Sequence, residues 1–331
     1  MLLRALLAAW PPERRLRAIL DARAADSLDL PSNSQCHWVH PTIRARLMAE
    51  VILRRHVGTG GTVLCFHGLP PLLPTRARVL VLLQNRLHLG RDSLSQFRWK
   101  TRLRLNVERW IGRGLRRRVA EYLVQTPTMR RAAEAHFGIQ PARQQRVRVL
   151  PFVEEMKSIL KTDGDSKRWD FVYVADGEAH KNHWMLFAAW KLMADDGMWP
   201  SLALTLGPRD VALKDEASRL RDELGLRIHD VGVLSRDQIV ELYMESGAMI
   251  FASLTESFGL PLIEATRLGL PIVAPELDYV RDVCLPAQTF DPSSALSIAR
   301  AVRRFLDCPE PTGALMTASE FWRELIEDRG Q

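Results

Sequence analysis

Residues 169–275 alternate short apolar runs with helical runs, and this alternation constrains the fold more than any other feature of the sequence. The runs predicted as strands are WDFVYVA (169–175), SLALTLG (201–207), RIHDVGVLS (227–235), AMIFAS (248–253) and PIVAP (271–275). The predicted helices lie between them, at 180–197, 215–225, 236–247 and 261–269. Strands that alternate with helices are joined by right-handed crossovers and are therefore parallel. We predict an α/β, doubly wound parallel sheet whose ligands bind at the carboxyl ends of the strands.

The first half of the chain contains further predicted strands, at 61–68, 77–85, 121–126 and 146–152. A chain of 331 residues exceeds what one core ordinarily serves, so we expect two domains of roughly 150 residues each. We place the first domain at 1–152 and the second at 153–312, with a hinge near Pro151. The remaining segment, 313–331, is predicted to hold a helix at 318–327 that packs back toward the first domain.

Charge is distributed unevenly along the chain. Residues 1–152 carry 27 Lys and Arg against 9 Asp and Glu, whereas residues 153–331 carry 19 against 30. The segment Arg98–Arg118 alone holds nine basic residues, with Glu108 as its one acid, and interleaves them with apolar side chains. On a helix this pattern favours either an anionic membrane surface or an arginine-coated surface helix whose apolar side lies in the core. Nucleic-acid binding is the weaker interpretation, because no recognisable nucleic-acid module accompanies the charge.

Other residue types exclude several classes of site. The four cysteines have no CxxC spacing, which favours a reducing, cytoplasmic setting over a disulfide framework or a zinc site. No run reaches the ~18–20 apolar residues of a membrane-spanning helix. His180 and His183 are three residues apart, but no third metal ligand is in view, so we predict no metal site. The tryptophans, Trp184 and Trp190 among them, are expected mainly in the core.

The segment Ser253–Glu264 (SLTESFGLPLIE) carries the strongest indication of chemistry. It follows an apolar strand, places Gly259 in a turn and Pro261 near the start of a helix. Unpaired N–H groups at such a helix start and the positive end of its dipole suit a diphosphate. Glu256 before the helix and Glu264 inside it can each accept hydroxyl hydrogen bonds, as a sugar or ribose requires. The alternative, in which Glu256 only neutralises the helix N-terminus and Glu264 is a solvated helix residue, is weakened by the glycine-proline turn between them.

The run Glu256-Ser-Phe-Gly-Leu-Pro-Leu-Ile-Glu264 resembles the E-x7-E motif of retaining GT-B glycosyltransferases, and EATRLGLPIVAP resembles glycosyltransferase family 4 (group 1). The resemblance implies that Glu256 contacts the donor sugar and that Glu264 binds the nucleotide ribose. The segment YVADGEAHKNHWMLFAAW is similar to the family region in which a lysine, here Lys181, reaches the donor diphosphate. The implied donor site also includes Ser257, Phe258, Gly259, Leu260, Gly207 and Leu234.

The chain departs from the family pattern at two places. Many members have an arginine where this chain has Ala175, so the diphosphate is expected to rely on Lys181, the helix N-terminus and another cation, with Arg209 and Arg267 as weak candidates. Members also open with a strand and a glycine-rich loop, whereas this sequence starts in what resembles the following helix. The resemblance thus implies either an N-terminal domain that lacks its first strand or a start that lies upstream.

The first half resembles the family more faintly, through FHGLPPLLP, LVLLQNRLHLG and EYLVQTPTM. Candidate contacts on the acceptor side are Asn85 and, more weakly, Arg86, His67 and His88, each weighed against a purely local role. The resemblance implies two Rossmann-like domains facing a cleft. It also implies retaining transfer of a hexose or deoxyhexose from a nucleotide-diphosphate sugar to a glycan or lipid-linked acceptor, with no tightly bound cofactor or metal.

In that interpretation the protein belongs to surface-polysaccharide assembly, as a cytoplasmic enzyme peripheral to the inner face of the plasma membrane, and binds no nucleic acid. The alternatives from the same fold are a nucleotide-sugar epimerase and a glycogen-phosphorylase-like enzyme. The alternative from another class is a non-catalytic basic protein that binds membranes or nucleic acid.

Overall fold

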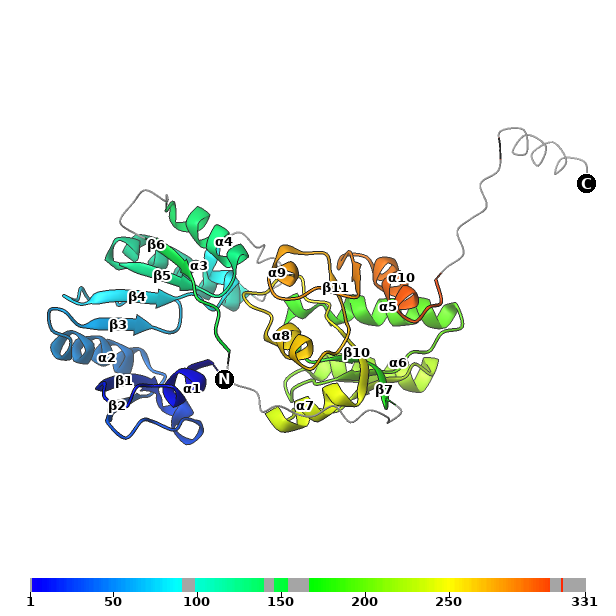
Figure 1. The fold of residues 1–331 in the computed structure, drawn as a ribbon, viewed down its shortest axis with the longest axis horizontal. Coiled ribbons are helices and arrows are strands. Elements are labelled where there is room, and N and C mark those ends of the chain that lie inside the picture. The colour runs from blue at the N-terminus through cyan, green and yellow to red at the C-terminus, as the bar shows by residue number, and fades with distance from the viewer. Residues whose placement is uncertain (1, 91–98, 140–145, 154–166, 310–316, 318–331) are drawn as a thin grey trace, which may run out of the picture.

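The computed structural model describes residues 2–90, 99–139, 146–153, 167–309 and 317, and Figure 1 shows their arrangement. The two larger parallel sheets, one in each half of the chain, are built on separate hydrophobic cores. The predicted α/β class with parallel sheets is therefore confirmed. The predicted boundaries at 152 and 312 stay predictions, and the predicted helix at 318–327 lies outside the described residues.

The second half forms a six-stranded parallel sheet in the order β12-β11-β10-β7-β8-β9. Its strands are β7 (Trp169–Tyr173), β8 (Leu202–Leu204), β9 (Ile228–Asp230), β10 (Ser246–Ile250), β11 (Ile272–Pro275) and β12 (Gln288–Phe290). Its helices are α5 (His183–Asp195), α6 (Val211–Leu224), α7 (Arg236–Met244), α8 (Leu260–Arg267), α9 (Asp278–Arg281) and α10 (Ala295–Phe305), with a 3-10 turn η4 (Ala179–Lys181). The strand order reverses between β7 and β10, which is the point where doubly wound sheets bind their ligands.

The apolar content of its strands explains why the secondary structure of this half was predicted well. Strands β8 and β10 are almost continuously buried, as expected of parallel strands covered on both faces. Trp190 of α5 packs edge-on against Phe171 of β7 at a centroid distance of 5.8 Å. The sequence analysis did not identify β12, α9 or α10, although α10 pairs with α5 on the sheet.

Helix α8 is delimited by two glycines in the left-handed region. Gly259 is its N-cap, with φ 69°. Pro261 occupies the first turn, where a backbone N–H would have no intrahelical acceptor, so the missing N–H of proline costs no hydrogen bond. At the other end the N–H of Gly269 donates to Thr266 and that of Leu270 to Ala265, which is a Schellman ending. The predicted helix bounds at 261–269 are thus confirmed to within two residues.

The first half forms a four-stranded parallel sheet in the order β3-β4-β5-β6. Its strands are β3 (Thr62–Cys65), β4 (Arg78–Leu82), β5 (Glu121–Val124) and β6 (Arg146–Val149). The associated helices are α2 (Ile43–His56), α3 (Trp99–Leu115) and α4 (Pro127–Phe137), with 3-10 turns η2 (Arg86–Leu89) and η3 (Arg116–Arg118). All four strands coincide with predicted runs. Helix α4 is capped by the Thr126 hydroxyl and ends at Gly138, φ 65°.

A separate two-stranded parallel sheet precedes these elements. Helix α1 (Leu2–Ala8) is followed by β1 (Leu16–Asp21), a 3-10 turn η1 (Ala22–Ser27) and β2 (Ser34–Val39), which pairs with β1 in register Leu16↔Ser34. The side chain of Arg17 joins this sheet to α2 through the His56 carbonyl, at 3.2 Å. The sequence analysis predicted the first helix but neither strand, because both mix polar and charged residues with the apolar ones.

The tryptophans depart from the prediction that they mainly form the core. Trp169 and Trp190 are buried, whereas Trp99, Trp110, Trp184 and Trp199 are exposed. Helical spacing alone did not reveal which face of each helix meets the sheet. Among the described residues, no helix has both the length and the apolar content needed to cross a bilayer.

Candidate functional site

Lys181 and Glu256 form an ion pair at the reversal point of the second sheet. Nζ of Lys181 lies 2.6 Å from Oε1 of Glu256, and the two side chains are only 16% and 13% exposed. Lys181 ends the 3-10 turn η4 after β7, and Glu256 lies in the loop after β10, so adjacent strands deliver them to the same edge. The structure therefore brings together the two residues that the resemblance implied for the donor sugar and the donor diphosphate.

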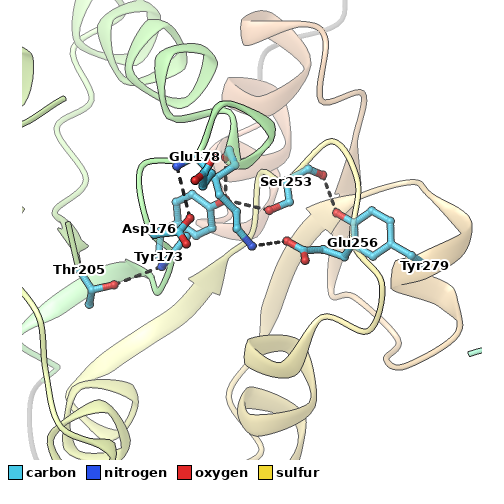
Figure 2. Close-up of polar contacts among 9 residues, drawn as sticks. Tyr173, Asp176, Glu178, Thr205, Ser253, Glu256 and Tyr279 are labelled. Carbon is cyan, nitrogen blue, oxygen red and sulfur yellow. Dashed lines mark hydrogen bonds and ion pairs between the residues drawn. The ribbon is translucent and has the colours of Figure 1, made fainter. Parts of the chain in front are cut away.

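Two buried tyrosines hold the loops that carry this pair (Figure 2). The hydroxyl of Tyr173 donates to the Lys181 carbonyl at 2.7 Å and lies 3.1 Å from the Ser253 hydroxyl. The hydroxyl of Tyr279 donates to the Ser253 carbonyl at 2.5 Å. Burial raises the pKa of both tyrosines, which therefore stay protonated donors at neutral pH. The position of the lysine is thus coupled to that of the loop that carries the glutamate.

Asn182 ties the same two loops from the other side. Its backbone is left-handed, with φ 64°, a conformation that asparagine tolerates better than most residues. Its side-chain amide donates to the carbonyls of Ala252, at 3.3 Å, and Pro292, at 2.8 Å. These roles of Tyr173, Asn182 and Tyr279 were not predicted from the sequence. Asn182 lies inside the helix predicted at 180–197, whereas the observed helix α5 begins one residue after it, at His183.

The turn predicted to hold a diphosphate lies beside this pair. Ser257 is partly exposed, Phe258 and Gly259 are buried, and Leu260 begins α8. Glu264 lies one turn into α8, and its Oε2 is 3.4 Å from the hydroxyl of Tyr243 on α7. Along the chain the two carboxylates flank this turn, and their donor contacts stay predictions.

Gly207 and Leu234 occupy loops at the same edge of the sheet, after β8 and β9. The N–H groups of Gly207 and Gly177 both donate to Oδ2 of Asp210, at 2.8 and 3.0 Å. A Cβ at Gly177 would collide with the Asp210 side chain, so any other residue there would have to displace that carboxylate. Leu234 packs against the core of this half. Their predicted donor contacts stay predictions.

Ala175, which stands where the family has an arginine, is buried, and its N–H donates to the Thr205 hydroxyl at 3.2 Å (Figure 2). The two cations offered as substitutes lie on the surface, Arg209 in the loop after β8 and Arg267 at the end of α8. Another arginine comes from the first half. Arg86 begins η2, which follows the carboxyl end of β4, and its positive charge lowers the pKa of Tyr279 against the larger raising effect of burial.

The other acceptor-side candidates lie at the carboxyl ends of β3 and β4. Asn85 is exposed and caps η2, accepting from the N–H of Leu87 at 2.9 Å, which is the local role weighed against a ligand contact. His67 is 3.1 Å from Arg46, and burial lowers its pKa to about 4. His88 pairs with Glu108 at 3.2 Å, and burial lowers its pKa also. Both imidazoles are therefore predominantly neutral at pH 7.

Helix α4 of the first half contacts the second half at this site. The Thr126 hydroxyl is 3.5 Å from the Ser257 carbonyl, and the N–H of Thr128 donates to Asp282 at 2.8 Å. Arg131 and Asp278 form an ion pair at 3.2 Å. The turn before α8 is thus contacted by residues from both halves, which the sequence analysis did not predict.

His183, weighed as a metal ligand, is buried against Tyr173 at a centroid distance of 4.9 Å. Burial lowers its pKa to about 4. His180 lies in η4, and its carbonyl accepts from the N–H of Leu254 at 2.8 Å. Within the described ranges, no three His, Cys, Asp or Glu side chains converge as metal ligands would.

Residues 155–319 match the family model described as glycosyl transferases group 1. A stretch of 139 residues is 30% identical to the serotype-specific mannosyltransferase WbdA of Escherichia coli, covering 41% of this chain and 17% of WbdA. This chain thus spans less than a fifth of the length of the curated relatives it matches.

Solved structures with the same fold cover more of the chain. Sucrose-phosphate synthase from Thermosynechococcus elongatus superposes with a TM-score of 0.65 at 16% identity, covering 89% of this chain and 90% of that structure. HepE of Anabaena, in complex with UDP and glucose, gives a TM-score of 0.54 at 12% identity with the same coverage. The chain therefore has the GT-B fold of two Rossmann-like domains, and its second half is similar to glycosyl transferases group 1.

Proposed function

We propose that this chain, a GT-B fold whose second half is similar to glycosyl transferases group 1, transfers a sugar from a nucleotide-diphosphate donor to a hydroxyl of a glycan or lipid-linked acceptor. The observation that carries the proposal is the Lys181–Glu256 pair at the reversal point of the sheet, with Glu264 one turn into the following helix. WbdA is a mannosyltransferase and HepE was solved with UDP and glucose, which supports a hexose donor.

The donor would lie across the turn before α8. Its diphosphate would meet the first-turn N–H groups of that helix and the ammonium of Lys181, which stabilises the leaving group. Glu256 would exchange its partner Lys181 for hydroxyls of the donor sugar, and Glu264 would accept from the ribose. The ion pair holds both side chains near these positions before the donor arrives, which reduces reorganisation on binding.

A diphosphate brings more negative charge than one lysine balances. Arg86 is the cation we propose as the second contact, because it follows the carboxyl end of β4 in the first half and its charge acts on Tyr279 of the second half. It would come from the acceptor-side half, so the two halves would need to be together for the leaving group to be fully stabilised. In this proposal Arg86 takes the role of the arginine that many members of the family have at the position of Ala175.

We propose that transfer retains the anomeric configuration. The bond from the anomeric carbon to the phosphate oxygen breaks, and a bond to the acceptor oxygen forms on the same face. The acceptor proton passes to the departing phosphate. Lysine and helix N–H groups supply the electrostatic stabilisation, so we expect turnover to survive exhaustive treatment with a chelator.

The test begins with a thermal-shift screen against UDP-, GDP- and dTDP-sugars, followed by transfer assays with the donor that binds. We expect Glu256→Gln and Lys181→Met to lower kcat by about 10²–10³. Glu264→Gln should mainly raise KM for the donor, by roughly tenfold. Glu241→Gln and Lys191→Met, at exposed positions of α7 and α5, are the matched controls.

Wild-type turnover and donor affinity in both glutamate variants would contradict the proposal. Isomerisation of the donor without any acceptor would instead indicate an epimerase.

A further inference from the structure

Helix α3 exposes a row of large apolar side chains. Trp99 and Trp110 are 68% and 74% exposed, and Leu103 and Val107 between them are exposed also. At about 100° per residue, these four side chains fall within about 80° of the helix circumference and extend about 17 Å along it. Leu105 and Gly112, the buried residues of the helix, lie on the opposite side. The row is therefore not the core-facing side of α3.

Basic side chains border this row on both sides. Helical geometry places Lys100 and Arg104 along one border and Arg102 and Arg113 along the other, and all four are exposed. The three arginines of η3 follow at the end of the helix. The only acid between Trp99 and Arg118 is Glu108, which is directed toward His88 of η2 at 3.2 Å. The exposed side of α3 thus combines an apolar centre with cationic borders.

We propose that this surface, defined by Trp99, Leu103, Val107 and Trp110 with their bordering cations, docks on an anionic lipid bilayer. Tryptophan prefers the boundary between headgroups and acyl chains, where its ring is buried and its N–H stays hydrated. A helix lying in the membrane plane would insert the row between the lipids while the arginines and Lys100 meet lipid phosphates. This inference refines the sequence-based expectation for Arg98–Arg118, of which Arg98 lies outside the described residues.

Charge complementarity favours a bilayer over the other occupants. In a two-fold dimer through this surface, the cationic borders of one copy would oppose those of the other, which is repulsive. A nucleic acid would neutralise the arginines but would leave four large apolar side chains without an apolar partner. An anionic bilayer satisfies both the row and its borders.

The test is flotation of the full chain with vesicles of phosphatidylcholine containing about one third phosphatidylglycerol, compared with phosphatidylcholine alone. We expect binding to the anionic vesicles only. The double variant Trp99→Ser, Trp110→Ser should bind them at least tenfold more weakly, on the order expected from losing two inserted rings. The control is Trp184→Ser, Trp199→Ser, which removes two exposed tryptophans from the second half and should bind like wild type.

The borders are tested separately. Lys100→Gln, Arg102→Gln, Arg104→Gln should weaken vesicle binding and flatten its dependence on salt. Because these side chains are exposed, all variants should keep the wild-type Tm.

Equal binding by wild type and the double tryptophan variant would overturn the proposal, as would binding to neither vesicle type. A tryptophan-dependent dimer in sedimentation, or DNA binding without vesicle binding, would overturn it in favour of the other occupants. These assays contain no donor sugar. A negative result would therefore overturn the membrane proposal without bearing on the proposed transferase activity, which the donor-binding and transfer assays test.

Discussion

The N–H of Thr128 in helix α4 donates to the carboxylate of Asp282 in the other half of the chain, at 2.8 Å. Thr128 is the second residue of its helix, where a backbone N–H has no intrahelical acceptor. The N–H of the next residue, Met129, is satisfied by Thr126 within the first half. The second half therefore completes the capping of a first-half helix, immediately beside the Ser257 carbonyl.

Replacing Asp282 should loosen the contact between the halves. Asp282→Ala removes a carboxylate acceptor at a helix N-terminus, which costs about 0.5–2 kcal/mol. We expect a larger radius of gyration in small-angle scattering and a lower kcat/KM. Asp215→Ala, at an exposed position of α6, is the control. An unchanged radius of gyration with unchanged kinetics would show that the contact does not hold the halves together.

The Lys181–Glu256 pair should show strong energetic coupling in the unfolding free energy. Either Lys181→Met or Glu256→Gln leaves one charge largely buried without its partner, which costs about 1–3 kcal/mol. The double variant removes both charges and should cost less than the sum of the single variants. Urea unfolding measures all three. A double-mutant cycle on the surface pair Glu216–Arg219 should give a coupling energy of about 1 kcal/mol or less. Equal coupling energies in the two pairs would contradict the expected effect of burial.

Tyr173→Phe should affect donor binding more than stability. The variant loses the hydrogen bond that fixes the backbone of Lys181 but keeps the buried ring, so we expect a loss of about 1 kcal/mol in unfolding free energy. The donor KM should rise, because the lysine is no longer held toward Glu256. Steady-state kinetics measure the change in donor KM, and denaturant unfolding measures the change in stability.

Tyr122→Phe provides the comparison in the first half. The Tyr122 hydroxyl is buried and has no hydrogen-bond partner among the described residues. Removing it should leave stability unchanged or raise it by up to about 1 kcal/mol, with no effect on the donor KM. If the two tyrosine variants behaved alike, Tyr173 would have no positioning role.

Stability should fall in mild acid because of buried histidines. His183 has a pKa of about 4 in the folded chain, lowered by burial, against an ordinary value of 6.5. Between these values the unfolded chain binds the proton and the folded chain does not, so its contribution is present above pH 6.5 and is lost as the pH falls toward 4. His136, which is also buried, acts in the same direction.

His183→Phe keeps an aromatic ring against Tyr173 but cannot titrate. The slope of unfolding free energy against pH should decrease by at most about 1.4 kcal/mol per pH unit between pH 6.5 and 4. Denaturant titrations at several pH values measure this slope. Parallel curves for variant and wild type would show that His183 does not contribute to it.

The sequence predicted the second half well because its information is local. Phe171 and Ile250 lie in apolar runs that are recognisable as buried parallel strands, and Gly259 with Pro261 specifies the start of α8 without reference to any distant residue. The family resemblance indicated Glu256 and Lys181 as site residues. In the folded sheet their strands are neighbours, so that Nζ of Lys181 lies 2.6 Å from Oε1 of Glu256.

The residues missed are those whose roles depend on distant contacts. Tyr173 is 80 residues from Ser253, and nothing in either local sequence indicates their hydrogen bond. Asn85 was expected at the acceptor side, yet its side chain is engaged by the nearby N–H of Leu87. The exposed row on α3 could not be separated from a core-facing row, because helical periodicity shows that residues share a side but not what covers that side.

Asp210 accepts from the amides of both Gly177 and Gly207, and its carboxylate fills the space that a side chain at Gly177 would need. Substitutions in the segment before Lys181, made to change donor preference, are therefore limited at position 177 by this carboxylate. Any bulkier residue at 177 would displace it and disturb the neighbouring loop as well. Productive libraries would have to vary positions 177 and 210 jointly.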